Sequence, residues 1–161
     1  MYRAGDVSAG LAPRVTGLGY TNSVPFATQT VLFGVDHIRN TLVQIGNRAD
    51  NAGLTRTIGP IGFDVTPRVG FDVNPVTGQV FAALQRPGQG FSRLYVFDLN
   101  TGRAGLLGPI GPGRLLADIA VDLRNAGTPC FAPTAAPAPP FAASSPIGTT
   151  TVGTTSTGFV F

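Results

Sequence analysis

The sequence of 161 residues contains no lysine, no glutamate and no tryptophan, and it has one cysteine and one histidine. Glutamate and lysine are strong helix formers and supply ion pairs between successive helical turns, so their absence argues against helices. A GC-rich genome, which favours arginine over lysine, explains the missing lysine equally well. A single cysteine excludes a disulfide within the chain, and the lack of lysine excludes a lysine–asparagine cross-link.

Positive charge is carried entirely by arginine, and no two of the eleven arginines are adjacent. The formal net charge is +3, but a nucleic-acid interface needs a basic patch, usually with stacking aromatics. We therefore expect a solvated surface and no nucleic-acid partner. No apolar run approaches the length of a membrane span, and residues 1–10 lack the apolar core of a signal peptide. The chain is expected to be soluble, or to be a mature form whose leader has been removed.

The residue types that carry catalysis or bind metals are scarce. His37, the one histidine, has no G-x-S-x-G motif to accompany it, and we interpret it as a residue of a surface turn. Aspartates end four predicted strands, at Asp36, Asp72, Asp98 and Asp122. They could bind calcium or act as paired carboxylates, but their repeated positions favour side chains that cap the following turns. We expect no enzyme activity, no metal and no cofactor.

Two further motifs receive structural interpretations. Cys130 lies between proline and phenylalanine, an apolar setting that favours an inert buried thiol over an intermolecular disulfide. The Gly-Pro-Ile-Gly blocks at residues 59–62 and 108–111 lack the lysine of a phosphate-binding loop. We interpret these blocks as turns at the edges of sheets.

Glycine and proline are abundant, with 22 and 14 residues, and interrupt the chain too often for long helices. Short apolar runs alternate with turn sequences such as residues 74–78 and 100–102, where asparagine and glycine tolerate positive φ. This pattern predicts an all-β barrel, sandwich or propeller. The predicted strands are residues 15–20, 30–36, 41–45, 54–58, 69–73, 79–84, 93–98, 104–107 and 116–122. The last of these could also form a short amphipathic helix, but an internal match favours a strand.

Internal repeats support this prediction. The matches pair residues 32–36 with 94–98, 58–62 with 107–111, 13–15 with 67–69 and, more loosely, 70–73 with 118–121. The interval between the first two blocks is longer in the first copy, which predicts a loop insertion near residues 47–53. We divide the chain into an extended segment (1–14), a β domain (15–127, with units at about 15–66 and 67–127) and a Pro/Ala/Thr-rich tail (128–161) with a C-terminal strand.

Several of these segments resemble a bacterial secreted family, domain of unknown function 4394. They are YTNS at residues 20–23, TVLFGVD at 30–36, NTLV at 40–43, GPIG at 59–62, GFDV at 70–73 and SRLYVFDLNTG at 92–102. The resemblance spans about residues 15–122 and implies a propeller-like fold of repeated units, with no established activity. It also implies that members carry further units before the segment that begins at Tyr20, so that this chain corresponds to the last half of the family pattern. A closed propeller has at least four blades, so two units leave open sheet edges that pair with other chains unless protected.

We therefore expect a structural subunit of an extracellular or cell-surface fibril or pilus-like polymer, in which copies of the chain exchange strands. The candidate donor residues are Tyr2, Val7 and Leu11 near the N-terminus and Val152, Phe159, Val160 and Phe161 near the C-terminus. The candidate sites for O-linked glycans are Thr150, Thr151, Thr154 and Thr155. The alternatives are an extracellular binding or adhesion module for a carbohydrate or surface ligand and, as a third reading, a hydrolase with paired aspartates.

Overall fold

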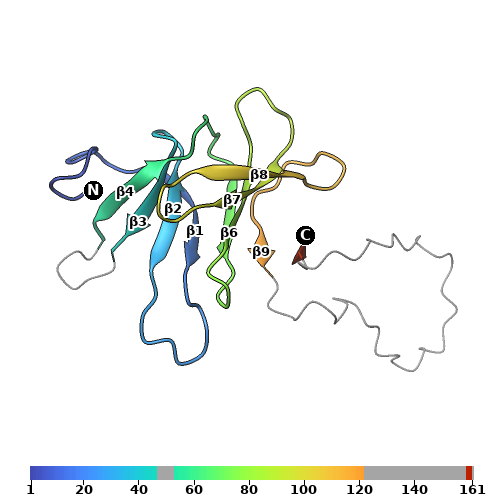
Figure 1. Cartoon of the computed structure of the whole chain (residues 1–161). Helices are drawn as coiled ribbons and strands as arrows, with labels where there is room; N and C mark the ends of the chain where they lie inside the picture. The colour runs from blue at the N-terminus through green and yellow to red at the C-terminus, as the bar shows by residue number, and fades with distance from the viewer. Residues whose placement is uncertain (47–52, 122–158, 161) are drawn as a thin grey trace, which may run out of the picture.

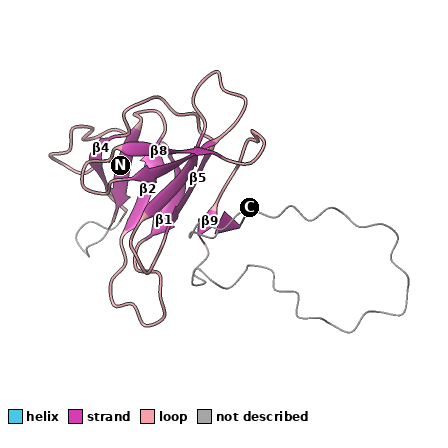
Figure 2. Cartoon of the chain, turned by 45° about the vertical axis from the view of Figure 1, so that its right-hand side comes forward, coloured by secondary structure: helices cyan, strands magenta, loops and turns pink. Residues whose placement is uncertain are grey.

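The computed structural model describes residues 1–46, 53–121 and 159–160, and in these residues it contains strands and loops but no helix (Figure 2). The all-β prediction is confirmed. The strands are β1 (Val15–Tyr20), β2 (Leu32–Asp36), β3 (Thr41–Ile45), β4 (Thr55–Pro60), β5 (Val69–Val73), β6 (Val80–Leu84), β7 (Arg93–Phe97), β8 (Ala104–Pro109), β9 (Ala120–Val121) and β10 (Phe159–Val160). The predicted strand at residues 116–122 is shorter than expected, because only β9 is extended there.

Two four-stranded antiparallel sheets form the body of the protein (Figure 1). Blade 1 has the order β1-β2-β3-β4 and blade 2 has the order β5-β6-β7-β8. Within each sheet, every strand pairs antiparallel with its neighbour in sequence. The two units therefore share one meander topology, with open edges at the ends of each sheet.

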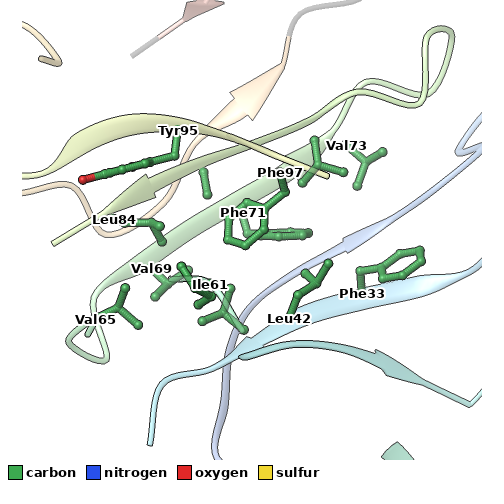
Figure 3. Close-up of a cluster of buried hydrophobic side chains, with 13 residues drawn as sticks. Phe33, Leu42, Ile61, Val65, Val69, Phe71, Val73, Leu84, Tyr95 and Phe97 are labelled. Atoms are coloured by element: carbon green, nitrogen blue, oxygen red, sulfur yellow. The ribbon is translucent and has the colours of Figure 1, made fainter. Parts of the chain in front are cut away.

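The main hydrophobic core lies between the two blades. Phe33 and Leu42 of blade 1 point toward Phe71 and other side chains of blade 2 (Figure 3), and Val35 belongs to the same buried cluster. The rings of Phe71 and Phe97 are tilted at 59° with centroids 5.7 Å apart, a favourable aromatic arrangement. Burial of each large apolar side chain stabilises the fold by about 1.5–3 kcal/mol. Face-to-face packing of the blades therefore supplies most of the hydrophobic stabilisation.

A third unit begins after blade 2. Phe81 and Ala83 on the far face of blade 2 pack with Ile110 and Ile119, and partly buried Val121 of β9 joins this second cluster. The backbone around Asp118 passes so close to Gly70 that a Cβ at this glycine would lie 2.8 Å from backbone atoms. Segment 110–121 thus covers the face of blade 2 that is turned away from blade 1.

Strand order corrects one repeat alignment. Residues 32–36 form β2, the second strand of blade 1, whereas residues 94–97 belong to β7, the third strand of blade 2. The two segments look alike because each leads through a polar turn into the next strand, although the turns join different strand pairs. The extra length in the first copy is therefore not a loop insertion alone, since β3 also lies within it.

The Gly-Pro-Ile-Gly blocks occupy equivalent places in the two blades, at the ends of β4 and β8. In each block the isoleucine is part of a core: Ile61 is buried between the blades and Ile110 is buried against blade 2. A glycine with positive φ follows each of them. The blocks are thus strand ends that insert an apolar side chain, rather than simple edge turns.

Candidate functional site

Of the four aspartates predicted to cap turns, three lie in the described residues, and two of these, Asp36 and Asp98, cap a turn. Asp36 Oδ1 accepts the N–H groups of residues 38 and 39, and Asp98 Oδ1 accepts the N–H of residue 100 at 2.8 Å. Asp72 instead accepts the N–H of Val121 at 2.6 Å and so joins β5 to β9. Asn74 caps the turn after β5, and Asp122 lies outside the described residues.

Asp36 is the centre of a buried hydrogen-bond network, with no exposed surface. Its Oδ2 atom accepts bonds from the Tyr2 hydroxyl at 2.7 Å, the Arg14 N–H at 3.2 Å and Arg39 Nη1 at 3.0 Å. Its Oδ1 atom accepts the N–H groups of Ile38 and Arg39. Arg39 also lies over the Tyr2 ring, with its guanidinium carbon 5.1 Å from the centroid. This network ties the N-terminus to the turn between β2 and β3.

The network shifts the pKa of the Asp36 carboxyl and the pKa of the Tyr2 hydroxyl. Burial alone would raise the pKa of the Asp36 carboxyl, but hydrogen bonds from Tyr2, Arg39 and Arg14 outweigh it and hold the pKa below its ordinary value. Burial first, and then the hydrogen bond to the Asp36 carboxylate, raises the pKa of the Tyr2 hydroxyl from 10.0 to about 12. The folded protein therefore favours a charged Asp36 beside a neutral Tyr2.

The raised pKa of Tyr2 predicts a loss of stability at alkaline pH. The contribution of the neutral phenol is fully present below the unfolded pKa of about 10 and is lost as pH rises through about 12. We expect the absorbance difference between the wild-type chain and Tyr2→Phe to titrate near pH 12 while the protein is folded. Titration of that difference near pH 10 would contradict a buried phenol bonded to Asp36.

The geometry around His37 does not assemble a catalytic group within the described residues. Its Nδ1 lies 2.8 Å from the Arg14 carbonyl oxygen, and its backbone N–H donates to the same oxygen. No group of three or more histidine, cysteine or acidic side chains that could hold a metal ion occurs in the described part of the chain. His37 therefore serves, in this structure, to fasten the N-terminal segment to the turn after β2.

Residues 1–14, here called the N-terminal cap, are not extended as predicted but turn repeatedly between residues 4 and 10. Tyr2 forms a parallel bridge with Thr55, and the Arg3 N–H donates to the Thr55 carbonyl. Asp6 accepts the N–H and the hydroxyl of Thr57 at 2.7 and 2.8 Å. The cap therefore covers the outer edge of β4 within its own chain, while Val7 and Leu11 stay exposed.

The outer edge of β8 differs from that of β4. β8 is the last strand of its sheet, and its first residue, Ala104, donates to the Ile61 carbonyl at 3.1 Å. Among the described residues, no further backbone partner pairs with this edge. Leu106 and Leu107 are more than half exposed there. The β8 edge is thus a strand edge with apolar side chains and no charged residue to block pairing.

The C-terminal strand β10 pairs antiparallel with β9, with Phe159 opposite Val121 and Val160 opposite Ala120 (Figure 1). Residues 122–158, which lie between the two strands in sequence, are outside the described residues. Val152, Phe161 and the glycosylation candidates Thr150, Thr151, Thr154 and Thr155 also lie outside them, as does Cys130. Of the C-terminal donor candidates, the described backbone thus places residues 159 and 160 in a strand.

Sequence reasoning missed two parts of this arrangement. Tyr2 and Asp36 are 34 residues apart, and no local pattern links them. Leu18 and Tyr20 lie in a predicted strand, yet both remain 52% exposed. Leu18 and Tyr20 become counterparts of core residues of β5 only when the β-bulge in β1 is taken into account, and the sequence does not reveal this bulge.

Two repeated four-stranded sheets packed face to face define an all-β repeat protein. A family model described as a domain of unknown function (DUF4394) matches residues 1–120, and the chain belongs to this family. The match includes the N-terminal cap, which is therefore part of the family domain. No curated protein and no solved structure matches the chain. No helix in the described residues is long and apolar enough to cross a membrane.

Proposed function

We propose that the protein is a structural subunit of an extracellular fibril or pilus-like homopolymer, assembled by addition of β-strands between copies. The observation that carries the proposal is the pairing of β10 with β9. β10 pairs with β9 although residues 122–158 lie between the two strands in the sequence. A long connection allows the same strand to pair with a neighbouring copy at little additional entropic cost.

The acceptor side of the proposal rests on the two free strand positions. Within the described residues β9 has no partner other than β10, so removal of β10 leaves an unpaired edge. The outer edge of β8 supplies a second position, because Leu106 and Leu107 are exposed and uncharged. Natural sheet proteins usually protect such edges with charges, proline or a covering segment. Blade 1 has a covering segment in the N-terminal cap, whereas in the described residues β8 has no charged residue and no covering strand, and carries only Pro109 at its end.

The test is electron microscopy of the purified full-length chain at increasing concentration. We expect regular filaments from the wild-type chain and loss of filaments from a chain that ends at Thr157, because the donor strand is removed. A double variant, Leu106→Lys with Leu107→Lys, tests whether the β8 edge takes part, since charged side chains oppose edge pairing.

The matched control is Val76→Lys, which adds the same charge to an exposed apolar residue in the turn between β5 and β6. Filaments should persist in this variant. Uniform small particles from the wild-type chain at every concentration would refute the proposal and direct the search to ligand binding instead.

A further inference from the structure

The first strands of the three units, β1, β5 and β9, are here called the innermost strands, and they stack in the same way. β1 packs against β5, and β5 packs against β9. On β1, a Cβ at Gly19 would lie 3.1 Å from side-chain atoms of Phe71 and Val73, so this strand presents a small residue to the following unit. On β5, Gly70 plays the same part toward the segment that leads into β9.

Each innermost strand also presents apolar side chains to the unit before it. Val69, Phe71 and Val73 of β5 are almost completely buried against blade 1. Val121 of β9 and Ile119, which directly precedes β9, likewise pack against the preceding unit, blade 2. Apolar residues toward the preceding unit and small residues toward the following unit thus form a repeated interface.

β1 carries the same apolar positions as β5. The shared Pro-Arg-Val sequence aligns Val15 with Val69. Because of the β-bulge between Thr16 and Leu18, the five paired positions of β1 then align Leu18 with Phe71 and Tyr20 with Val73. Phe71 and Val73 are 2% exposed, whereas Leu18 and Tyr20 are each 52% exposed.

The direction of these side chains follows from their contacts. A Cβ at Gly34 would lie 2.8 Å from Leu18 Cδ2, and Gly34 is on the face of blade 1 opposite to Phe33 and Val35. Leu18 and Tyr20 therefore point away from blade 2. The N-terminal cap covers the β4 side of this face through Thr55 and Thr57, and leaves the β1 side uncovered.

The last unit presents the complementary side. Ala120 of β9 is exposed, while its neighbours Ile119 and Val121 pack against blade 2. Ala120 is thus a small residue turned toward a following unit, as Gly19 is in β1. The described residues contain no unit that covers this side.

We infer that Leu18 and Tyr20 of one copy dock on the side of β9 that carries Ala120 in a second copy, so that the blade stacking continues from molecule to molecule. The inference rests on the proposed homopolymer and adds a contact between faces to the exchange of strand edges. The contact joins two different surfaces, so it is head to tail and generates a ring or an open filament. The docking area is confined to the innermost strand, because the N-terminal cap occupies the outer part of blade 1.

The test uses two full-length variants, each of which removes one side of the contact. Leu18→Asp with Tyr20→Asp blocks the β1 side, and Ala120→Arg blocks the β9 side. By sedimentation velocity, we expect each variant alone to require about tenfold or more higher concentration to associate than the wild-type chain. Mixed in equal amounts, the two variants should form pairs at the wild-type concentration, because each keeps the surface that the other lacks.

Val76→Asp is the control for an added charge, and circular dichroism of every variant verifies that it is folded. If the wild-type chain associates and Leu18→Asp with Tyr20→Asp associates equally well, the docking inference is wrong while the polymer proposal stands. A mixture that associates no better than the separate variants would also overturn it. A wild-type chain that stays monomeric would overturn both.

Discussion

Replacement of Asp36 by alanine is expected to lower the free energy of unfolding by about 3–5 kcal/mol, the usual cost of removing one partner from a buried charged network. The change leaves the Tyr2 hydroxyl, the Arg14 N–H and the Arg39 guanidinium without their common acceptor. It also removes the acceptor of two N–H groups in the turn between β2 and β3. Urea unfolding followed by circular dichroism measures the loss.

Asp98→Ala is the matched control, because Asp98 caps the β7–β8 turn in the same way but is exposed. We expect a much smaller loss than for Asp36→Ala, because water replaces the hydrogen bonds of an exposed carboxylate. Asp36→Asn should fall between the two alanine variants, since an amide keeps one acceptor oxygen but loses the charge. Equal losses for Asp36→Ala and Asp98→Ala would show that burial of the network contributes nothing.

The lowered pKa of Asp36 sets the sign of the acid dependence. A carboxyl whose folded pKa lies below its unfolded value stabilises the protein above the unfolded pKa of about 4, and this stabilisation is lost as pH falls through the folded pKa. The wild-type chain should therefore lose stability in acid more steeply than Asp36→Asn. Asp6, whose pKa is also lowered, gives the same dependence to both chains and so cancels in the comparison.

The sequence was sufficient to predict most strands, because local chemistry determines them. Three predicted strands, β1, β3 and β5, have the predicted bounds. Asparagine and aspartate in the intervening turns hydrogen-bond backbone N–H groups two or three residues ahead, as for Asn74 and residues 76 and 77. Such turns are stabilised by local hydrogen bonds and do not depend on the rest of the fold, so their sequences predict where strands end.

The arrangement of the strands was less predictable, because similar turns join different strand pairs. Asp36 ends β2 and Asp98 follows β7, each before a polar turn, and this similarity led to an alignment of the second strand of one sheet with the third strand of the other. The N-terminal cap was predicted to be an extended segment and a candidate donor strand, but it folds into turns against its own chain. Its turns are held by distant residues, since Asp6 accepts a hydrogen bond from the Thr57 hydroxyl, and the local sequence does not predict such contacts.

Substitution of Gly59 by alanine is expected to destabilise the protein by about 3 kcal/mol, at the upper end of the usual cost of overpacking. Gly59 lies near the end of β4, where the backbone of blade 1 passes the β7–β8 turn of blade 2. A Cβ there would overlap the Thr101 carbonyl oxygen, and the same position on Gly102 would lie 2.5 Å from the Gly59 oxygen. The obstacle on both sides is backbone, which cannot rotate away as a flexible side chain does.

Gly105→Ala is the matched control, in an edge strand of the other blade. A Cβ at Gly105 would make an ordinary contact, 3.6 Å from Val96 Cγ1. We expect this variant to be unchanged or stabilised by about 0.4–1 kcal/mol, because alanine restricts the unfolded chain more than glycine does. Thermal unfolding of the two variants should therefore move in opposite directions. If Gly59→Ala unfolds like Gly105→Ala, the blades do not approach each other through their backbones at this point, and the packing of blade 1 on blade 2 must differ from that described.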